Sequence, residues 1–594
     1  MQEFTTPGEV AVPADDNVVT ALLANAERFP QRPALAYRSG DRFVDVSTKD
    51  LVTTVRELAA GLISLGIEAG SRVCLFMPAR IEFTYLDYAI WAAGCATVTI
   101  YETSSADQVE WIVGNSGSVA VLCGSQDQRK VFDAVAQNLP DAKHVFVVDD
   151  GAIEELTRLG RNIPQSEVDA RIDGITHDGL GTLVYTSGTT GRPKGCALTH
   201  GNLIWDTRQA VAALREILDA DASTLAFLPL AHILARVVQV ACVTQGVRIG
   251  YASSFARLVP EMQELKPTFI VAVPRVFEKV YGVAQSGAAK GAKKRIFERA
   301  TAVAIEHSKQ SAAGAVSRRT QLEHTVLDKL VYSKLRAAFG GRMRFALSGG
   351  APLGERLGHF FDGAGVQVLE GYGLTETTGG ATVNTPTFFR IGSVGRPVPG
   401  ASARIAEDGE IMLKGGHIFQ GYWRNPEATA AVLGDDGWFA TGDIGEVDDD
   451  GFVRITGRKK DLIVTAGGKN VAPAVLEDLV RADRIISQCV VVGDARPFIA
   501  CLVTLDAEEL PGFAAQHGME TVDDAAGQKA LHAEVKKAID SANAAVSHAE
   551  AIKAFRILPG DFTIESGELT PSLKVRRPVV LANYAVQIEA IYAR

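Results

Sequence analysis

Apolar and polar positions in the first third of the chain alternate between helical and strand spacing. Ser47 and Asp50 match an N-cap sequence, which predicts a helix that ends at Gly66. Apolar residues recur at helical spacing within it, at Leu51, Val55, Leu58, Leu62 and Ile63. Short apolar, β-branched runs follow at 73–77, 96–101, 119–123 and 145–148. This alternation predicts an α/β domain with a buried, largely parallel sheet.

The amino-acid composition indicates a globular protein but does not indicate which reaction or ligand it serves. The chain has 594 residues, of which 47% are apolar and 22% charged, as expected for a globular protein of several domains. Its net charge of -10 argues against a general nucleic-acid binder. The seven cysteines are scattered without a C-x-x-C pair, which indicates reduced core residues and neither a zinc site nor a disulfide framework.

The N-terminal segment and the longest apolar runs bear on location. Residues 1–17 have neither a basic start nor an apolar stretch typical of a signal peptide. No apolar run approaches the roughly 20 residues that a membrane-spanning helix needs. We therefore expect a cytoplasmic protein.

A Gly-, Ser- and Thr-rich stretch gives the first chemical signal. Residues 186–195 read T-S-G-T-T-G-R-P-K-G and directly follow a short apolar strand. Glycines allow backbone N–H groups to approach an anion, while hydroxyls, Arg192 and Lys194 add donors and positive charge. The stretch is not a Walker loop, because Gly195 follows Lys194 where Ser or Thr would be required. An ordinary Gly/Ser turn is the alternative, but such turns rarely carry two cations.

The longer segment 185–203, Y-T-S-G-T-T-G-R-P-K-G-C-A-L-T-H-G-N-L, resembles the signature of the adenylate-forming superfamily. This superfamily includes acyl-CoA synthetases, adenylation domains of peptide synthetases and firefly-type luciferases. The resemblance implies that the loop binds ATP. The residues implied are Thr186, Ser187, Gly188, Thr189, Thr190 and Lys194.

A second pair of motifs lies at 348–353, S-G-G-A-P-L, and 370–377, E-G-Y-G-L-T-E-T. Paired glycines allow close approach to a flat base, and an exposed Tyr372 is able to stack on it. Thr375 offers a hydroxyl to phosphate, and Glu376 is a hard carboxylate suited to Mg²⁺. The resemblance implies an adenine shelf and the same phosphate and metal roles. The shelf residues are Gly350, Ala351 and Tyr372, and Gly373 is also implied to bind the nucleotide.

A third motif region supplies Asp443 and Arg458. A carboxylate accepts from both ribose hydroxyls and an arginine donates to the same sugar, although a turn aspartate and a surface basic cluster are equally ordinary interpretations. The whole block 436–470, however, is similar to the fatty acyl-CoA synthetase signature. That similarity implies that both residues bind the nucleotide.

The resemblance also implies two domains. A large N-terminal multi-subdomain α/β domain with mostly parallel sheets would span 1–458, and a small mobile α+β lid would span 459–594, with a hinge at Lys460. Gly467 and Gly468 would then let the pantetheine arm of CoA pass. The segment 567–577, G-E-L-T-P-S-L-K-V-R-R, resembles the closing motif of the family and makes Lys574 the catalytic lysine.

His232 lies in the segment 227–236, F-L-P-L-A-H-I-L-A-R, which is similar to long-chain acyl-CoA synthetases, as is V-P-R-V at 273–276. A lone histidine is more often a core or turn residue, but the resemblance places His232 beside the carboxylate being activated. It implies a long-chain fatty-acid–CoA ligase that is ATP- and Mg²⁺-dependent. Such an enzyme forms acyl-AMP with release of pyrophosphate and then transfers the acyl group to CoA.

Residues 281–340 form a basic insert with eleven Lys/Arg against four Asp/Glu, a net of +7. If the insert is helical, one apolar face contains Ile296, Ala300, Val303 and Ala304. The charge indicates either a solvated helical insert or a face that approaches anionic lipid or CoA. A peripheral location at the inner face of the membrane is compatible with the second interpretation, and a homodimer with the resemblance.

Three alternatives stay open from the sequence. A fatty acyl-AMP ligase would stop at the adenylate and pass the acyl group to a carrier protein. A peptide-synthetase module is disfavoured because no carrier motif follows Lys574. A non-catalytic nucleotide-binding, membrane-associated scaffold would not need Lys194, Glu376 and Lys574 together.

Overall fold

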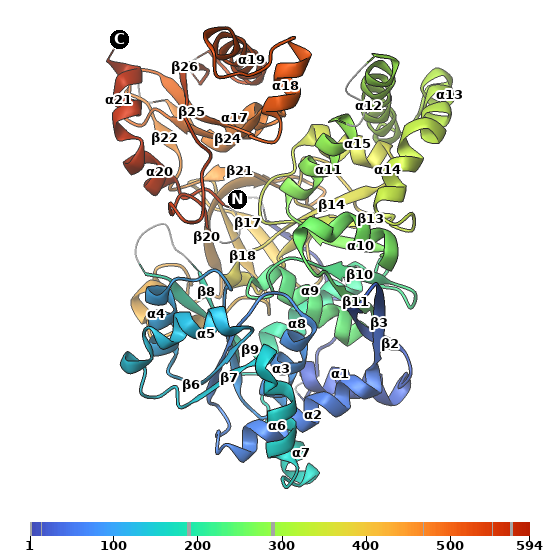
Figure 1. Ribbon diagram of the computed structural model, residues 1–594, viewed down its shortest axis with the longest axis vertical. Coiled ribbons are helices and arrows are strands. Elements are labelled where there is room, and N and C mark those ends of the chain that lie inside the picture. Colours follow the sequence, from blue (N-terminus) through green and yellow to red (C-terminus); the bar gives the residue numbers. More distant parts are fainter. Residues whose placement is uncertain are drawn as a thin grey trace.

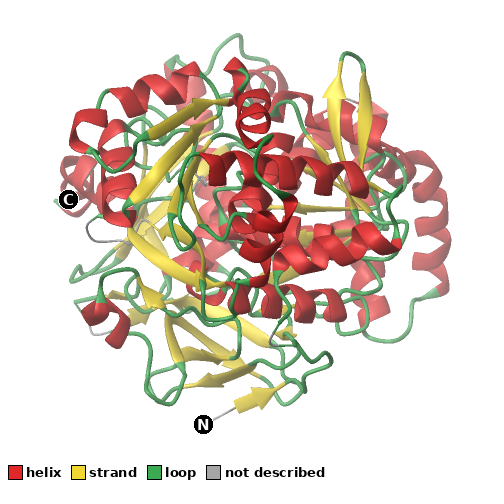
Figure 2. Ribbon diagram, turned by 90° about the horizontal axis from the view of Figure 1, so that it is seen from below, coloured by secondary structure: helices red, strands yellow, loops and turns green. Residues whose placement is uncertain are grey.

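A computed structural model describes residues 3–13, 15–186, 192–286, 291–466, 469–548, 550–570 and 574–593. The chain forms a large N-terminal domain, drawn from blue to light orange in Figure 1, and a small C-terminal domain in darker orange and red at one end of it. Figure 2 shows helices packed over strands through the centre of the molecule, with further strands open at the edge beside the N-terminus. This layered arrangement confirms the α/β fold predicted from the sequence.

The largest sheet has seven strands in the order β19-β9-β8-β5-β4-β6-β7, and its central strands are parallel. Its strands are β4 (Arg72–Phe76), β5 (Ala96–Ile100), β6 (Ser118–Cys123), β7 (His144–Val147), β8 (Leu180–Thr186), β9 (Lys194–Thr199) and β19 (Gly421–Tyr422). All four apolar runs of the first third therefore form strands of one sheet, as predicted. Strands β8 and β9 are antiparallel, so the Gly-rich loop is the connection of a hairpin.

Two further sheets complete the centre of the large domain. The first, in the order β10-β11-β2-β3, contains β2 (Pro33–Ser39), β3 (Arg42–Ser47), β10 (Ser223–Ala226) and β11 (Arg248–Tyr251). The second, in the order β12-β13-β14-β15-β16, contains β12 (Phe269–Ala272), β13 (Phe345–Ser348), β14 (Gln367–Tyr372), β15 (Thr382–Val383) and β16 (Arg396–Pro397). Strands β12, β13 and β14 are parallel. Their carboxyl ends therefore meet at one edge, where ligands bind in open α/β sheets.

An antiparallel sheet in the order β1-β17-β18-β20-β21 ends the large domain. Its strands are β1 (Glu3–Thr5), β17 (Ser402–Ile405), β18 (Glu410–Lys414), β20 (Phe439–Val447) and β21 (Val453–Arg458). In the register of β20 and β21, Asp443 pairs with Arg458. The two residues predicted to bind ribose are thus cross-strand neighbours.

Helices cover the sheets of the large domain. They are α1 (Val18–Arg28), α2 (Thr48–Ser64), α3 (Ile81–Ala92), α4 (Ala106–Ser116), α5 (Gln126–Asp133), α6 (Ala152–Gly160), α7 (Gln165–Asp173), α8 (His200–Ala213), α9 (Ile233–Gln245), α10 (Leu258–Leu265), α15 (Glu355–Gly363) and α16 (Pro426–Ala430). Helix α2 is the one predicted from its cap: the Ser47 side chain accepts from the backbone N–H of Asp50, and all five predicted apolar positions are buried.

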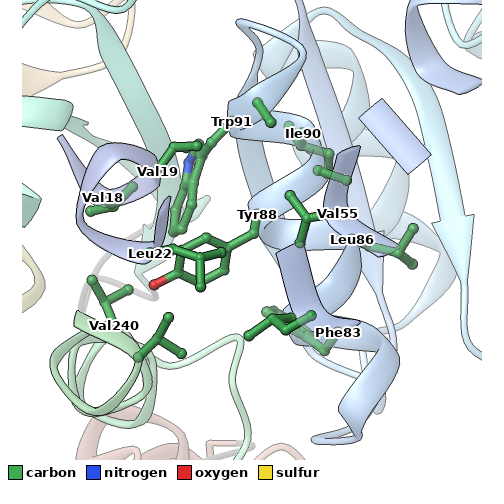
Figure 3. Close-up of a cluster of buried hydrophobic side chains, with 14 of the residues drawn as sticks. Val18, Val19, Leu22, Val55, Phe83, Leu86, Tyr88, Ile90, Trp91 and Val240 are labelled. Atoms are coloured by element: carbon green, nitrogen blue, oxygen red, sulfur yellow. The ribbon is translucent and has the colours of Figure 1, made fainter. Parts of the chain in front are cut away.

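The core of the large domain is centred on α3, which is buried on nearly all sides. Figure 3 shows its Phe83, Tyr88 and Trp91 packed against Leu22 of α1 and Val240 of α9. All seven cysteines are buried and reduced, as predicted. In the part of the chain that the structure describes, we find no helix with both the length and the apolar character needed to cross a bilayer.

The predicted basic insert is helical. It comprises the end of α11 (Pro274–Ser286), then α12 (Gly291–Ala312), α13 (Arg318–Leu327), a π-helical turn η4 (Asp328–Tyr332) and α14 (Ser333–Ala338). Ala300, Val303 and Ala304 are buried against the domain as predicted, but Ile296 is 40% exposed. Ile296 shares this face of α12 but lies at its edge, where its neighbour Phe297 is the buried side chain.

The small domain follows β21. It contains a two-stranded and a three-stranded sheet, formed by β22 (Ile463–Val464), β23 (Asn470–Val471), β24 (Ile486–Val492), β25 (Ile499–Leu505) and β26 (Ile552–Ile557). Its helices are α17 (Pro473–Arg481), α18 (Leu510–Gln516), α19 (Ala525–Asn543), α20 (Arg577–Asn583) and α21 (Ala585–Tyr592). Strands β24 and β25 are buried along almost their whole length, so this domain has a core of its own.

Candidate active site

The predicted phosphate loop connects β8 to β9, and Thr186 and Lys194 are paired across the hairpin at its base. Ser187, Gly188, Thr189 and Thr190 lie outside the described residues. The residues directly after the loop, Arg192 and Pro193, contact the side chain of Trp111. The guanidinium of Arg192 lies 4.8 Å from the ring centre of Trp111, whose Nε1 donates to the carbonyl of Pro193 at 2.8 Å.

Lys194 and Glu376 meet through a residue that the sequence analysis did not single out. The ammonium group of Lys194 lies 4.8 Å from the ring centre of Tyr422, and the Tyr422 hydroxyl donates to Oε1 of Glu376 at 2.7 Å. Glu376 is in the 3₁₀ turn η5 (Thr375–Thr377), which begins at Thr375. The short motif G-Y-W at 421–423 is the only sequence signal for Tyr422.

The residues predicted to form an adenine shelf lie at the carboxyl ends of β13 and β14. Gly350 has φ of +84°, a left-handed conformation that favours glycine, and both Gly350 and Ala351 face the cleft between the domains. A Cβ on Gly373 would overlap the carbonyl oxygen of Gly379, so no side chain fits there. Gly373 thus allows the backbone of 373 to pack against that of 379, whereas the open space beside Gly350 allows backbone approach to a flat ligand.

Tyr372, Asp443 and Arg458 form one hydrogen-bonded group. The Tyr372 hydroxyl donates to Oδ2 of Asp443 at 2.6 Å, and Nε of Arg458 donates to Oδ1 of Asp443 at 2.8 Å. Tyr372 is buried, so the expectation of an exposed ring is wrong: its hydroxyl is tied to Asp443 in the interior. Burial, followed by the charge of Asp443, raises the pKa of Tyr372 well above its ordinary value. Tyr372 therefore remains a neutral donor that orients Asp443.

Lys574 reaches this group from the small domain. Its Cε lies 3.9 Å from the position that a Cβ on Gly350 would occupy. Desolvation by the surrounding protein, followed by the positive charge of Arg458, lowers the pKa of Lys574. The side chain nevertheless keeps access to solvent, because it lines the open cleft.

His232 is the N-cap of α9, and its Nδ1 accepts from the backbone N–H of Leu234 at 3.2 Å. Burial and then the charge of Lys574 lower the pKa of His232 to about 4, so the imidazole is neutral at pH 7. Because the charge of Lys574 acts on His232, the structure brings together a histidine of the large domain and the predicted catalytic lysine of the small one.

The cleft between the domains has a volume of about 1240 Å³ and is lined by many of the predicted site residues. These are Gly350, Ala351, Tyr372, Gly373, Asp443, Arg458 and Lys574. Among the described residues, the polar contacts across it are few: Arg275 donates to Ser487 at 3.3 Å, Arg356 donates to the carbonyl of Ala482 at 3.5 Å, and Lys279 lies 3.5 Å from Glu508. Lys460, the predicted hinge, is in an exposed turn after β21, whereas Gly467 and Gly468 lie outside the described residues.

Two acids that line the cleft, Glu370 and Asp478, have raised pKa values. Burial raises the pKa of Glu370 to about 7, and the carboxylate of this residue accepts from the backbone N–H of Leu353 at 3.0 Å. Burial also raises the pKa of Asp478, on α17 of the small domain, to about 6. The negative charge of Asp478 contributes to the shift of Glu370, so the two acids interact across the cleft.

A second arginine–aspartate pair lies beneath the site. Arg236, one helical turn after His232, donates from Nε to Oδ2 of Asp87 at 2.8 Å and from Nη2 to Oδ1 at 2.5 Å. Its Nη1 donates to Thr182 on β8, and Asp87 also accepts from Thr97. Both charged side chains are fully buried. This network, which the sequence analysis missed, joins the helix of His232 to the strand that leads into the phosphate loop.

Comparison with known proteins agrees with this geometry. The sequence pattern of the AMP-binding enzyme family matches residues 22–423, and that of the AMP-binding enzyme C-terminal domain matches 460–594. The chain is 46% identical to the long-chain-fatty-acid–CoA ligase FadD15 of Mycobacterium bovis, with 100% of both chains covered. It is 32% identical to the long-chain-fatty-acid–CoA ligase ACSBG2 of Xenopus laevis, over 94% of this chain and 81% of that one.

A solved structure supports the fold. ATP-bound MatB from Rhodopseudomonas palustris superposes with a TM-score of 0.71 at 24% identity, covering 96% of this chain and 98% of that chain. The chain therefore belongs to the family of AMP-binding, adenylate-forming enzymes, as predicted. Within that family it groups with the long-chain fatty-acid–CoA ligases.

Proposed function

We propose that this protein is an AMP-forming long-chain fatty-acid–CoA ligase that works in two half-reactions. In the first, the fatty carboxylate attacks the α-phosphorus of ATP, giving acyl-AMP and pyrophosphate. In the second, the thiol of CoA attacks the acyl carbon, giving the thioester and AMP. The observation that carries this proposal is the position of Lys574. Its side chain extends from the small domain to Gly350 of the large one, and its charge contributes to the lowered pKa of His232.

The first half-reaction brings two anions together, so positioning and charge neutralisation account for most of the catalysis. Lys574 and the loop between Thr186 and Lys194 supply positive charge and donors for the carboxylate and the phosphates. Thr375 donates a hydroxyl to phosphate, and Asp443 and Arg458 hold the ribose. Neutral His232 lies beside the carboxylate without adding a charge there.

Glu376 is the residue that would hold Mg²⁺. Its carboxylate is a hard oxygen ligand, it is oriented by the Tyr422 hydroxyl, and it lies near the base of the phosphate loop through the Tyr422–Lys194 contact. Among the described residues, no group of three or more acidic, His or Cys side chains could hold a metal. A site with one carboxylate completed by substrate phosphates fits the usual coordination of Mg²⁺. When bound, the ion would neutralise charge on the phosphates.

We propose that the acyl chain lies along α9, behind His232. Four side chains on one face of this helix, Ala235, Val238, Gln239 and Cys242, line an apolar cavity of about 30 Å³, which has to widen to hold an acyl chain. Leu225 of β10 and Ile249 of β11 line its opposite wall. From His232 to Cys242 the helix rises by about 15 Å, a large part of the length of an extended long-chain acyl group.

The second half-reaction requires a different arrangement of the small domain. We propose that the large domain spans 1–458 and the small one 459–594, and that rotation about Lys460 exchanges Lys574 for the segment containing Gly467 and Gly468. The exposed turn at Lys460 and the few polar contacts across the cleft support such a movement. We also propose that the protein acts in the cytoplasm, at the inner face of the membrane where its acid substrate partitions.

ATP–pyrophosphate exchange across a series of carboxylic acids, run beside a CoA-dependent thioester assay, tests the proposal. We expect exchange and thioester formation with long-chain acids, with much less of both for short ones. Exchange without thioester would contradict the CoA-ligase assignment and favour an acyl-AMP ligase. Absence of ATP turnover with every acid would favour a non-catalytic nucleotide-binding protein.

A further inference from the structure

Helix α13 and the π-helical turn after it expose a stripe of large aliphatic side chains. Leu322 is 70% exposed, Val326 is 59% exposed and Leu330 is 49% exposed. These residues are spaced four apart, so they lie on one face of the helix. The opposite face, with Thr320 and Leu327, is buried against the domain. The fold therefore uses one side of α13 for packing and leaves an apolar side uncovered.

Positive side chains flank this stripe. Arg318, Lys329 and Lys334 are exposed, and among the described residues none of them is paired with a carboxylate. The segment 318–336 contains five Lys/Arg and two Asp/Glu, a net of +3 in a chain whose net charge is -10. Apolar side chains in a basic surround are typical of a helix that lies in the interface of an anionic bilayer.

The two acids of the segment do not cancel this charge. Glu323 accepts from Arg319 at 3.0 Å and also from Arg299 of α12, and Asp328 accepts from Arg336 at 2.7 Å. Each acid is thus already paired with at least one arginine of α12, α13 or α14. Arg318, Lys329 and Lys334 remain available for an external anionic partner.

The location of the stripe suits a lipid substrate. In Figure 1, α12 and α13 stand side by side at one upper corner of the molecule, opposite the small domain. Lys294 and Phe297 of α12 line the cleft between the domains, so the pair of helices extends from the cleft to the outer surface. A bilayer in contact with α13 would therefore lie near the cleft in which the acid reacts.

We propose that Leu322, Val326 and Leu330, with Arg318, Lys329 and Lys334, form a docking surface for a bilayer that contains anionic phospholipid. The apolar side chains insert among the acyl chains while the basic ones contact the head groups. This inference rests on the proposed function only for the reason why docking is useful, namely access to a lipid substrate. The binding of the surface to a bilayer requires no catalysis.

Co-sedimentation of the full-length protein with lipid vesicles tests the surface. We expect binding to phosphatidylcholine vesicles in which about a third of the lipid is phosphatidylglycerol, and weaker binding at high salt or without the anionic lipid. The double variant Leu322→Glu/Val326→Glu should bind these vesicles at least about tenfold more weakly. The double variant Arg318→Ala/Lys329→Ala should lose about tenfold on anionic vesicles and little on neutral ones.

Val586 provides a matched control, because it is an 80% exposed aliphatic residue on α21 of the small domain. Val586→Glu should bind vesicles within about twofold of the wild type, since scattered exposed apolar residues do not make a docking surface. An unchanged far-UV circular dichroism spectrum and an unchanged midpoint of urea denaturation would establish that each variant is folded. Equal vesicle binding by wild type and Leu322→Glu/Val326→Glu would overturn the proposal.

Three further outcomes distinguish a bilayer-docking surface from a protein interface and from the ligase reaction. If light scattering finds a wild-type dimer that Leu322→Glu/Val326→Glu converts to a monomer, the stripe is an interface between copies and the lipid proposal is wrong. A protein that binds anionic vesicles but forms no thioester would contradict the ligase proposal and leave the docking surface standing. Ligase activity without vesicle binding would contradict the docking surface and leave the ligase proposal standing.

Discussion

Two arginine–aspartate pairs of this protein use the same chemistry in different surroundings. Asp87 and Arg236 lie in the core of the large domain, and both side chains are fully buried. Asp443 and Arg458 lie in the cleft, where the aspartate is buried but the arginine side chain is 51% exposed. The first pair is closed off by hydrogen bonds to Thr97 and Thr182, whereas the second opens toward the space between the domains.

This difference in exposure indicates different roles: the buried pair positions other elements, and the pair in the cleft is able to bind a ligand. A fully desolvated ion pair tolerates neither loss of a partner nor displacement, so Asp87 and Arg236 hold α9 against β8 and thereby fix His232 relative to the phosphate loop. A pair in contact with solvent is able to exchange water for a ligand. Asp443 and Arg458 therefore suit a nucleotide site, and variants of the two pairs should separate stability from activity.

The largest effect is expected from breaking the buried pair. Asp87→Asn removes the negative charge and leaves the Arg236 guanidinium buried without compensation, so the free energy of unfolding should fall by about 3–5 kcal/mol. Asp443→Asn is the matched substitution in the cleft, and solvent at Arg458 should limit its stability cost to about 1 kcal/mol. Urea denaturation of both variants measures the difference, and equal costs would contradict the distinction.

Lys574→Ala should affect activity and not stability. In the proposed mechanism Lys574 supplies a positive charge to the reacting carboxylate and α-phosphate, so its loss should lower ATP–pyrophosphate exchange by about 10²–10³-fold. Lys553→Ala, at an exposed lysine on β26 of the same domain, is the control and should leave exchange unchanged. Thioester formation from supplied acyl-AMP should persist in Lys574→Ala, and its loss there would assign Lys574 to both half-reactions.

A pH effect is expected from the core around Arg236. His200 packs edge-on against Trp91, and burial followed by the charge of Arg236 lowers the pKa of His200 from 6.5 to about 4. The unfolded state thus binds the proton more readily, and stability is lost as pH falls from above 6.5 toward 4. At pH 5 this residue alone should cost about 2 kcal/mol relative to neutral pH.

His200→Gln tests this assignment, because glutamine does not titrate. Denaturation of the variant should depend less steeply on pH between 7.5 and 5 than that of the wild type, by about 2 kcal/mol. His177 lies close enough to contribute repulsion, so a second variant at that position would separate the two histidines. Identical pH dependence in His200→Gln and wild type would refute the role of His200.

The smallest effect is expected from a substitution at Gln239, which lies between the core of the large domain and the proposed acyl cavity. Gln239 is buried on α9, and within the described structure neither of its amide atoms has a hydrogen-bond partner. Gln239→Leu would replace this polar group in the proposed acyl cavity by an apolar one of similar size. We expect about 1 kcal/mol greater stability and a severalfold rise in kcat/KM for long saturated acids, with no change for short ones. A lower kcat/KM for long acids would argue against the cavity as their site.

Local patterns in the sequence were sufficient for many elements of the fold. The cap at Ser47 and the apolar spacing after it predicted α2, and short β-branched runs predicted four strands of the central sheet. Such features depend on neighbours a few residues away, which a sequence displays directly. The same spacing put Ile296 on one face with Ala300, but it does not say where the edge of the buried part falls, and Ile296 is 40% exposed.

The sequence by itself determined the family and the residue types of the site, because its motifs combine residues whose chemistry is tied to short spacings. Only the tertiary structure decided which of them meet: Lys574 with Gly350, Tyr422 with Glu376, and Asp87 with Arg236. These contacts join residues far apart in the chain, and they depend on how sheets and helices pack. Packing also left the stripe on α13 uncovered, which no local pattern could indicate.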